Sequence, residues 1–236
     1  MNVGALVLAA GRGERLGGAI PKAFVPLAGK PMLLHALAAI SAVPAIDFVV
    51  PVVARSELPR MDALAAELAG IRGMRPAVAG GVERQDSVAA GLAALPPETE
   101  LVAVHDAARP LVGARAVARV VDAARASGAA ILAVPARDTI KRARAGRILE
   151  TPLRSECYAA QTPQVFRVEL LREALEKAAA DRFLGTDDSE LVERLGVPVD
   201  LVSGEESNFK VTDRADMAAA ECWLTDQRAE GEEAIA

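Results

Sequence analysis

The sequence predicts an α/β protein in which a mostly parallel central sheet is flanked by helices on both faces. Apolar runs of strand length alternate with segments of helical period along most of the chain, which is typical of this class. The first and fourth runs are apolar throughout, as strands buried on both faces should be. Of the 236 residues, 52% are hydrophobic, so alanine, valine and leucine can fill a core without a disulfide or a structural metal.

The elements follow one another in a regular order. The expected strands are Val3–Ala9, Asp47–Val53, Met74–Ala79, Leu101–His105, Ala129–Pro135 and Val197–Val202. Three helices are predicted from apolar stripes, which comprise Met32, Leu33, Leu37 and Ile40, then Leu64 and Leu68, then Val88, Leu92 and Leu95. Further helices are expected over Ala114–Ser127, Val168–Ala180, Ser189–Leu195 and Asp213–Asp226. This alternation predicts a single domain over residues 1–227 and a frayed tail over 228–236.

One segment, from about residue 137 to residue 161, interrupts this alternation. It is rich in arginine and lysine, contains Gly146 and Pro152, and shows little helical periodicity. Two short extended runs, Thr139–Arg142 and Arg147–Thr151, flank an Ala-Gly pair, which favours a hairpin. We therefore expect a protruding β-arm, and such an arm often contacts a second subunit.

Composition argues against several classes of partner. The formal net charge is −5, the pI is about 5.3 and 3% of the residues are aromatic, which disfavours a nucleic acid polymer as partner. No apolar stretch approaches the ~20 residues of a membrane span, and the N-terminus lacks a basic leader. Cys157 and Cys222 match neither a CxxC pair nor a zinc pattern, so free buried thiols are expected. We expect a cytoplasmic protein that does not bind membranes.

Glycines lie directly after the first strand, in the loop that contains Gly11 and Gly13. Backbone N–H groups of such a loop can surround an anion without obstruction by side chains, so phosphate binding is the first hypothesis. A dinucleotide fingerprint lacks its third glycine here, and a P-loop lacks its Gly-Lys-Ser/Thr. The segment does carry Arg15 and Lys22, two cations that suit a polyphosphate. The alternative is that both are solvated charges on an ordinary turn.

Two further loops follow predicted strands. The fourth strand ends in His105 and Asp106, with Arg109 soon after, and open α/β sheets bind ligands at these carboxyl ends. Asp106 there can meet a metal ion or a ribose hydroxyl. The alternative is that Asp106 caps a helix and pairs with Arg109, while His105 is hydrogen-bonded in the core. The loop over Gly80–Ser87 permits close approach of a flat ligand, because its glycine pair has no side chains, although Ser87 can also be plain helical surface.

Several strings of residues together resemble those of a known family, the 2-C-methyl-D-erythritol 4-phosphate cytidylyltransferases of the non-mevalonate isoprenoid pathway. In chain order they are Leu8–Gly17, Pro21–Phe24, Gly80–Val88, His105–Pro110, Val134–Lys141, Gln161–Gln164, Thr186–Asp188 and Asn208–Thr212. The resemblance spans nearly the whole chain. It has departures at Ala23, where many members have Gln, at Leu16, where Met is common, and at Phe209, where Ile is usual. None of the three removes a charged contact.

The resemblance implies a Rossmann-like nucleotidyltransferase fold and a homodimer that exchanges its arms. It also implies a Mg²⁺-dependent reaction of CTP with 2-C-methyl-D-erythritol 4-phosphate that releases pyrophosphate. Arg15 and Lys22 fall on the two catalytic cations of the family. The positions implied at the nucleotide are Ala9, Ala10, Gly11, Gly13, Gly80, Gly81, Arg84, Ser87, Asp106 and Ala107, with Asp106 also near the metal. Those implied at the acceptor substrate are Arg109, Thr139, Arg154, Thr162, Thr186 and Lys210.

Three other functions compete with this one. The most distant is a sugar-nucleotide pyrophosphorylase that uses another base, since such enzymes share the first loop but not the context of Arg154 and Lys210. Ribitol 5-phosphate cytidylyltransferases share much of the pattern, but they tend to carry Ala-Gly-Gly in the first loop and His-Asp-Ala-Val-Arg in the second. This chain has Ala-Ala-Gly over residues 9–11 and Ala-Ala-Arg over residues 107–109. A catalytically silent nucleotide-binding subunit is the alternative from another class, and the presence of both Arg15 and Lys22 argues against it.

Overall fold

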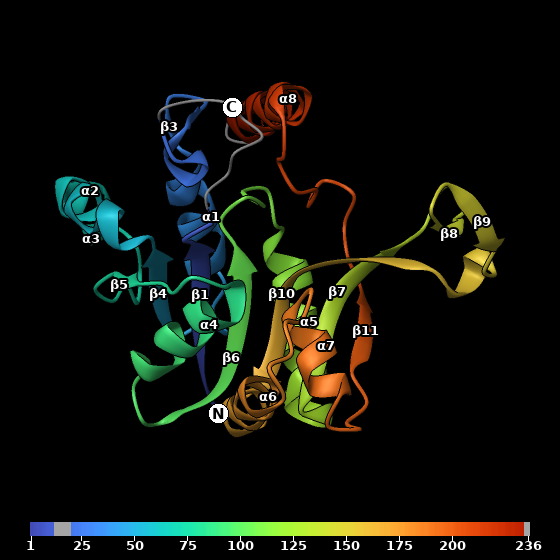
Figure 1. Cartoon of the computed structure of the whole chain (residues 1–236). Coiled ribbons are helices and arrows are strands. Elements are labelled where there is room, and N and C mark those ends of the chain that lie inside the picture. The colour runs from blue at the N-terminus through green and yellow to red at the C-terminus, as the bar shows by residue number, and fades with distance from the viewer. Residues whose placement is uncertain (12–19, 234–236) are drawn as a thin grey trace.

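The computed structural model describes residues 1–11 and 20–233, with side chains described as far as residue 226. A seven-stranded sheet with the order β11-β7-β10-β6-β1-β4-β5 forms its centre (Figure 1). Its strands are β1 (Asn2–Ala9), β4 (Phe48–Val53), β5 (Val78–Ala79), β6 (Thr99–Asp106), β7 (Ala129–Pro135), β10 (Tyr158–Arg167) and β11 (Asp200–Ser203). Neighbouring strands are parallel, except that β10 runs antiparallel to both β6 and β7. The mostly parallel α/β sheet that the sequence predicts is confirmed.

Helices cover both faces of this sheet (Figure 1). They are α1 (Met32–Ser41), α2 (Leu58–Ala63), α3 (Ala65–Ala69), α4 (Arg84–Ala93), α5 (Ala114–Ser127), α6 (Val168–Asp181), α7 (Asp188–Glu193) and α8 (Arg214–Glu233), with short 3-10 helices η2 (Lys22–Phe24), η3 (Arg55–Glu57) and η4 (Arg154–Glu156). Successive strand residues point to opposite faces, so Val7 of β1 packs with α1 and α5, whereas Leu6 packs with α4 and α6. None of the described helices is both long and apolar enough to span a membrane.

Strand β10 is the main element that the sequence does not predict. Pro163 argues against a central strand because proline donates no hydrogen bond to a ladder. The structure accommodates it with a shift of register between Ala160 and Gln164, so that Pro163 lies outside the paired residues. The excursion expected over residues 137–161 therefore ends earlier, because the chain rejoins the sheet at Tyr158.

Four boundaries also differ from prediction. Strand β5 is confined to two residues of the expected Met74–Ala79, because Pro76 cannot donate to the ladder. Strand β11 begins after Pro198 instead of before it. The second predicted helix is divided at Leu64 into α2 and α3. The last helix, α8, continues to Glu233, within the tail that we expected to be frayed.

The predicted β-arm is a hairpin that protrudes from the sheet (Figure 1). We define the arm as residues 137–157. Its strands β8 (Arg142–Arg144) and β9 (Arg147–Glu150) pair with each other through a turn in which Ala145 and Gly146 both have positive φ, as in a type I′ turn. Its large apolar side chains are exposed, by 64% at Ile148, 51% at Leu149 and 66% at Leu153.

The expectation of buried thiols is wrong. Cys157 is half-buried at the base of the arm, and Cys222 is exposed on α8. Both cysteines are free, as expected.

Candidate active site

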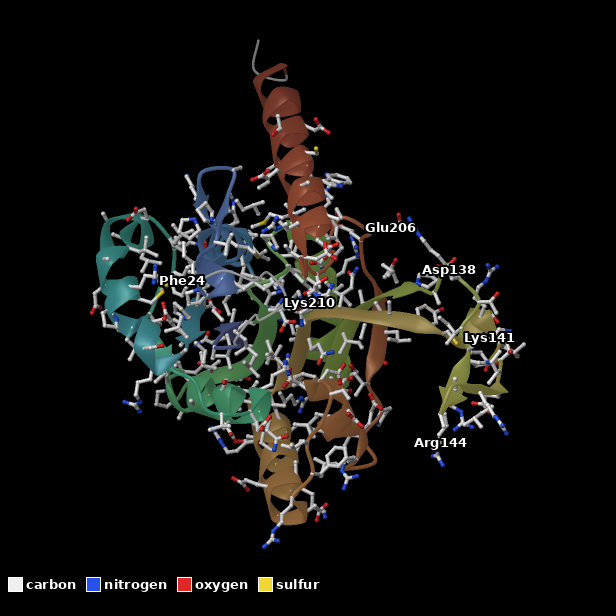
Figure 2. The ribbon with its side chains drawn as sticks, turned by 45° about the horizontal axis from the view of Figure 1, so that its top comes forward. Phe24, Asp138, Lys141, Arg144, Glu206 and Lys210 are labelled. Atoms are coloured by element: carbon white, nitrogen blue, oxygen red, sulfur yellow. The ribbon has the colours of Figure 1, made fainter. Side chains whose placement is uncertain are left out.

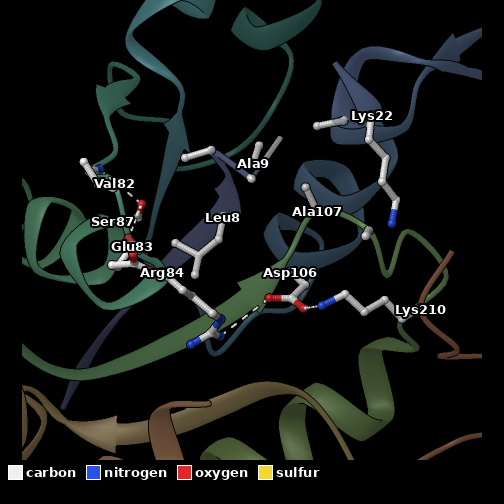
Figure 3. Close-up of a pocket in the computed structure, with 15 residues that line it drawn as sticks. Leu8, Ala9, Lys22, Val82, Glu83, Arg84, Ser87, Asp106, Ala107 and Lys210 are labelled. Carbon is white, nitrogen blue, oxygen red and sulfur yellow. Dashed lines mark hydrogen bonds and ion pairs between the residues drawn. The ribbon is translucent and has the colours of Figure 1, made fainter. Parts of the chain in front are cut away.

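A cavity of about 300 Å³ lies at the carboxyl ends of β1 and β6, the edge at which open α/β sheets bind ligands. Its wall combines the end of β1, η2, the start of α4, the segment after β6 and a late loop (Figure 3). The lining residues are Leu8, Ala9, Ala10, Gly11, Lys22, Ala23, Gly81, Val82, Glu83, Arg84, Ser87, Asp106, Ala107, Ala108 and Lys210. The parallel order of the strands thus brings three sequence-distant loops to one place.

The turn before α4 has no room for added side chains. A Cβ atom on Gly80 would lie 2.6 Å from Ala10 Cβ and 2.7 Å from Ser87 Oγ. The Ser87 hydroxyl accepts a hydrogen bond from the Gly81 N–H and donates one to the Glu83 carbonyl, both at 3.2 Å. These contacts hold the turn against the first loop, so its backbone forms one wall of the cavity.

Asp106 stands between the charged groups of the cavity. Its Oδ2 accepts a hydrogen bond from Lys210 Nζ at 2.6 Å, and its Oδ1 lies 3.5 Å from Arg84 Nη2 (Figure 3). Burial alone would raise the pKa of this carboxyl, but the charges of Arg84 and Lys210 outweigh burial and lower the pKa to about 2. Asp106 is therefore ionised near neutral pH, and its side chain is still 13% exposed toward the cavity.

Lys22 lies across the cavity from Arg84 and Ser87 (Figure 3). It belongs to η2, whose next two residues are buried and so anchor the segment in the core. The charge of Lys22 also helps to lower the pKa of Asp216 near the start of α8, although hydrogen bonding from Thr212 is the main cause of that shift. A cation is thereby set opposite the glycine turn.

The loop that carries Lys210 is fixed by side chains of β10. Gln161 Nε2 donates to the Glu205 carbonyl at 2.8 Å, and Gln161 Oε1 accepts from Asn208 Nδ2 at 3.2 Å. The same Asn208 amide donates to the Thr162 carbonyl at 2.9 Å. The unpredicted strand thus supports one of the predicted cations.

His105 is buried and hydrogen-bonded in the core, as one of the two alternatives predicts. The Thr162 hydroxyl accepts from the Asp106 N–H at 3.0 Å, so its own hydrogen points to His105 Nδ1, also at 3.0 Å. The other ring nitrogen, Nε2, then carries the proton and donates to the Arg109 carbonyl at 3.0 Å. Burial lowers the pKa of His105 to about 4, so the ring is neutral at pH 7.

The rest of that alternative, in which Asp106 caps a helix and pairs with Arg109, is wrong. The next helix, α5, begins only at Ala114. The Arg109 side chain donates to the carbonyl oxygens of Asn208 at 2.7 Å and Ala160 at 3.1 Å. Arg109 thus joins the Lys210 loop to β10, while Asp106 pairs with other cations.

Most of the residues predicted at the nucleotide line the cavity. They are Ala9, Ala10, Gly11, Gly81, Arg84, Ser87, Asp106 and Ala107, joined by the predicted cations Lys22 and Lys210. Gly80 lies directly behind this wall, in contact distance of Ala10. Gly13 and Arg15 lie outside the described residues.

The other residues predicted at the acceptor do not line this cavity. They are Arg109, Thr139, Arg154, Thr162 and Thr186. The Thr186 hydroxyl donates to the Glu190 carboxylate at 2.9 Å. Thr139 and Arg154 belong to the arm, which Figure 2 shows well apart from Lys210. One chain therefore does not bring these five predicted residues to the cavity wall.

Sequence reasoning missed several residues of the site. Leu8, Val82, Glu83 and Ala108 line the cavity, and their one signal was that each adjoins a predicted residue. Asp188 is buried behind the wall, where it lies 2.7 Å from Arg84 Nη1. Its pairing with a residue of another helix has no local pattern that a single sequence could reveal.

Comparison with known proteins assigns the family. A family model described as IspD, 2-C-methyl-D-erythritol 4-phosphate cytidylyltransferase, matches residues 3–226. The chain belongs to this family. A relative of that name from Geotalea uraniireducens (strain Rf4) is 44% identical, over 95% of this chain and 97% of its own. Another from Pelotomaculum thermopropionicum is 45% identical, over 93% of each chain.

Solved structures agree with this membership in the cytidylyltransferase family. The 4-diphosphocytidyl-2C-methyl-D-erythritol synthase of Anaerococcus prevotii is similar with a TM-score of 0.83 and 32% identity, over 95% of this chain and 96% of that one. The 2-C-methyl-D-erythritol 4-phosphate cytidylyltransferase of Thermus thermophilus has a TM-score of 0.75 and 37% identity, over 94% of this chain and 98% of that one. The nucleotidyltransferase fold predicted from the resemblance is confirmed.

The three departures from the family's usual residues fall at different places in this cytidylyltransferase. Ala23 is buried at the cavity wall, and Phe209 packs beside Lys210 on the core beneath α8. Leu16 lies outside the described residues. None of the described departures removes a charged group from the cavity.

Proposed function

We propose that this chain transfers the cytidylyl group of CTP to 2-C-methyl-D-erythritol 4-phosphate and releases pyrophosphate, in isoprenoid precursor biosynthesis by the non-mevalonate pathway. The observation that carries the proposal is the cavity at the ends of β1 and β6, where Lys22, Lys210 and Asp106 line the wall in a chain of this family. Local positive charge of this kind suits two anionic substrates, whatever the net charge of the whole protein. Free thiols fit a reducing compartment, so we place the enzyme in the cytoplasm.

The nucleotide would lie along the wall that the glycine turns form. The base would lie against the turn of Gly80 and Gly81, beside Ser87 and Arg84, where the two glycines let the backbone of the turn pack closely on Ala10 and Asp86. The ribose would lie at Asp106 and Ala107. The triphosphate would lie along the first loop, which comprises Ala9, Ala10, Gly11, Gly13 and Arg15, since backbone N–H groups there can face phosphate oxygens.

The proposed reaction needs no protein base. An oxygen of the ionised acceptor phosphate attacks the α-phosphorus of CTP; the new P–O bond forms as the bond to pyrophosphate breaks, and pyrophosphate takes the electron pair. The protein therefore has to align two anions and offset the charge that gathers on phosphorus. We assign this task to Lys22 and Arg15. His105 is already engaged at both ring nitrogens, which excludes it as the base.

Mg²⁺ is the proposed metal, and Asp106 is the residue that would hold it. Mg²⁺ commonly binds one or two carboxylates together with substrate phosphates. Within residues 1–11 and 20–233, no cluster of three or more His, Cys, Asp or Glu side chains could form a metal cage. The ionised and partly exposed Asp106 fits the shared arrangement instead. When bound, the ion would offset part of the negative charge of the triphosphate.

The acceptor side is proposed to be completed by a second copy of the chain in a homodimer. The acceptor phosphate would lie at Lys210, near Arg109, Thr162 and Thr186, with Thr139 and Arg154 supplied by the partner arm. Two observations support this arrangement. The arm of the same chain does not reach the cavity wall and leaves large apolar side chains exposed. Residues 137–157 also carry a net charge of +3, which suits an arm that supplies cations to a phosphate.

The test is pyrophosphate release from CTP and Mg²⁺ by the purified protein, with methylerythritol phosphate and ribitol 5-phosphate as parallel acceptors. Release with the first acceptor alone is the expected result. Release with the second alone would keep the chemistry and overturn the pathway. Thermal stabilisation by CTP with no product from either acceptor would indicate a silent nucleotide-binding protein.

A further inference from the structure

Asp188 is a charged side chain with no exposed surface and no part in the chemistry proposed above. It is the first residue of α7, and one of its carboxylate oxygens lies 2.7 Å from Arg84 Nη1. Among the described residues, neither oxygen accepts a further hydrogen bond. Burial raises the pKa of Asp188, and the charge of Arg84 opposes that rise. Buried ion pairs are seldom a net source of stability, so a stabilising role alone is a weak explanation for Asp188.

The backbone of Asp188 is held by β10, independently of Arg84. The side-chain oxygen of Gln164 accepts hydrogen bonds from the N–H groups of Asp188 and Ser189, at 3.1 and 3.0 Å. The amide nitrogen of Gln164 donates to Asp187, which caps α7, at 2.7 Å. The start of α7 is therefore tied to a strand in the middle of the sheet, and Asp188 is a fixed point.

Arg84 connects this fixed point to the cavity. Its Nη1 pairs with Asp188, and its Nη2 lies 3.5 Å from Asp106 Oδ1. Arg84 is also the first residue of α4, directly after the glycine turn. The planar guanidinium thus has a carboxylate at each of its two terminal nitrogens, and its position is determined by both.

We propose that Asp188 is a positioning residue for the nucleotide: through the Arg84 guanidinium, it fixes Asp106 and the start of α4 in the arrangement that receives CTP. Asp188 itself does not touch the substrate, because it has no surface in the cavity. Without the charge of Asp188, the ion pair at Nη1 is lost, and the guanidinium keeps its ion pair with Asp106 at Nη2. This inference rests on the proposed cytidylyltransferase activity and adds a residue behind the cavity wall to that site.

The test is Asp188→Asn, which keeps the shape of the side chain and removes its charge. The matched control is Glu193→Gln, which removes a charge from an exposed position of the same helix. Pyrophosphate release is measured against CTP and against the acceptor separately, CTP affinity by calorimetry, and stability by thermal unfolding. We expect the kcat/KM for CTP to fall by about tenfold to a hundredfold in Asp188→Asn, as for other residues that orient a binding group. The KM for CTP should rise more than the KM for the acceptor, and the control should match the wild type.

A second comparison keeps the inference testable if Asp188→Asn does not fold. The double variant Arg84→Gln with Asp188→Asn removes both members of the buried ion pair. It is compared with Arg84→Gln, in which the Asp188 carboxylate loses its counter-ion and can take up a proton instead. If Asp188 acts through Arg84, these two proteins have the same kcat/KM for CTP. A double variant much less active than Arg84→Gln would overturn the inference, as would a folded Asp188→Asn protein with wild-type CTP kinetics. The proposed function fails separately, if the wild-type protein releases no pyrophosphate with either acceptor.

Discussion

At the cavity, charged side chains are held by partners from several elements. On the arm, a hairpin that forms a sheet of its own, Arg142 pairs with Glu150 of the same hairpin, and Arg137 at the base pairs with Glu206 (Figures 1 and 2). Asp106 is bound by Lys210 and Arg84, and Arg84 by Asp188. On the arm, Arg154 donates to one backbone carbonyl within the same segment. The cavity is thus preorganised inside one chain, while the arm leaves large apolar side chains exposed, which is typical of an element that packs on a partner.

The difference shows where each half of the proposed site gets its order. The side chains of the cavity are held in place by the sheet beneath them, so the cavity should bind CTP in an isolated chain. The arm would be held in place by a second copy of the chain, so binding of the acceptor should depend on formation of the dimer.

The largest effect is expected from Lys22→Ala, which removes the described cation opposite the glycine turn. One preorganised donor of this kind is worth about a hundredfold to a thousandfold in rate, and the fold should be unchanged because Lys22 is not a core residue. Pyrophosphate release and thermal unfolding check both statements. Lys30→Ala, at an exposed position of the β2–β3 hairpin (Pro26–Leu27 and Lys30–Pro31), is the control and should keep its activity. Near wild-type release by Lys22→Ala would contradict the mechanism.

A mixture of two inactive variants tests whether the arm serves a second copy. Lys22→Ala disables the cavity, and Arg154→Ala disables the arm, so each alone should lose most of its activity. Dimers with one chain of each kind restore one complete site, so an equal mixture should recover up to about a quarter of the wild-type sites if subunits exchange at random. Pyrophosphate release after joint refolding measures the recovery. No recovery from folded, mixed dimers would mean that the arm does not complete a neighbour's site.

The buried side chain of His105, beneath the cavity, makes the stability of the folded protein depend on pH. The pKa of His105 is about 4 in the folded chain and about 6.5 when unfolded, so the unfolded chain takes up the proton first as the pH falls. The contribution of the neutral ring is fully present above pH 6.5 and is lost as the pH falls toward 4, by roughly 3 kcal/mol. Urea unfolding at pH 7 and pH 4.5 should show this loss in the wild type and a smaller one in His105→Gln. An equal loss of unfolding free energy between pH 7 and pH 4.5 in the wild type and in His105→Gln would contradict this prediction.

The smallest effect is expected at the glycine turn. A Cβ atom on Gly80 would meet Ala10 Cβ at 2.6 Å, and that atom cannot swing away because it is attached to backbone. Gly80→Ala should lower the free energy of unfolding by about 1–3 kcal/mol, the range for overpacked sites, and raise the KM for CTP. Gly70→Ala, whose nearest neighbour would be 3.7 Å away, should leave both unchanged. Equal effects of the two substitutions would show that the turn is not tightly packed.

The parts of the fold and of the site that could be predicted from the sequence are those that local patterns indicate. The glycine turns, Lys22 and Asp106 follow buried strands in the sequence, so the parallel order predicted that they meet. Asp188 and Gln164 lie in two of the strings that resemble the family, but their pairings join distant segments, so no periodicity or spacing indicates which residues they contact. Strand β10 was hidden by Pro163, because the register shift that accommodates a proline depends on the two neighbouring strands.

The place of β10 also orders the assembly of the protein as it leaves the ribosome. Strands β6 and β7 do not pair with each other, and both pair with β10. A nascent chain that ends at residue 157 therefore leaves one edge of β6 open and β7 without either of its neighbours, β10 and β11. Open strand edges are the usual sites of mispairing between chains. By then β1, β4, β5 and α4 have been synthesised, so the wall for the nucleotide can form early. The support for His105 and Lys210 arrives only with the last third of the polypeptide.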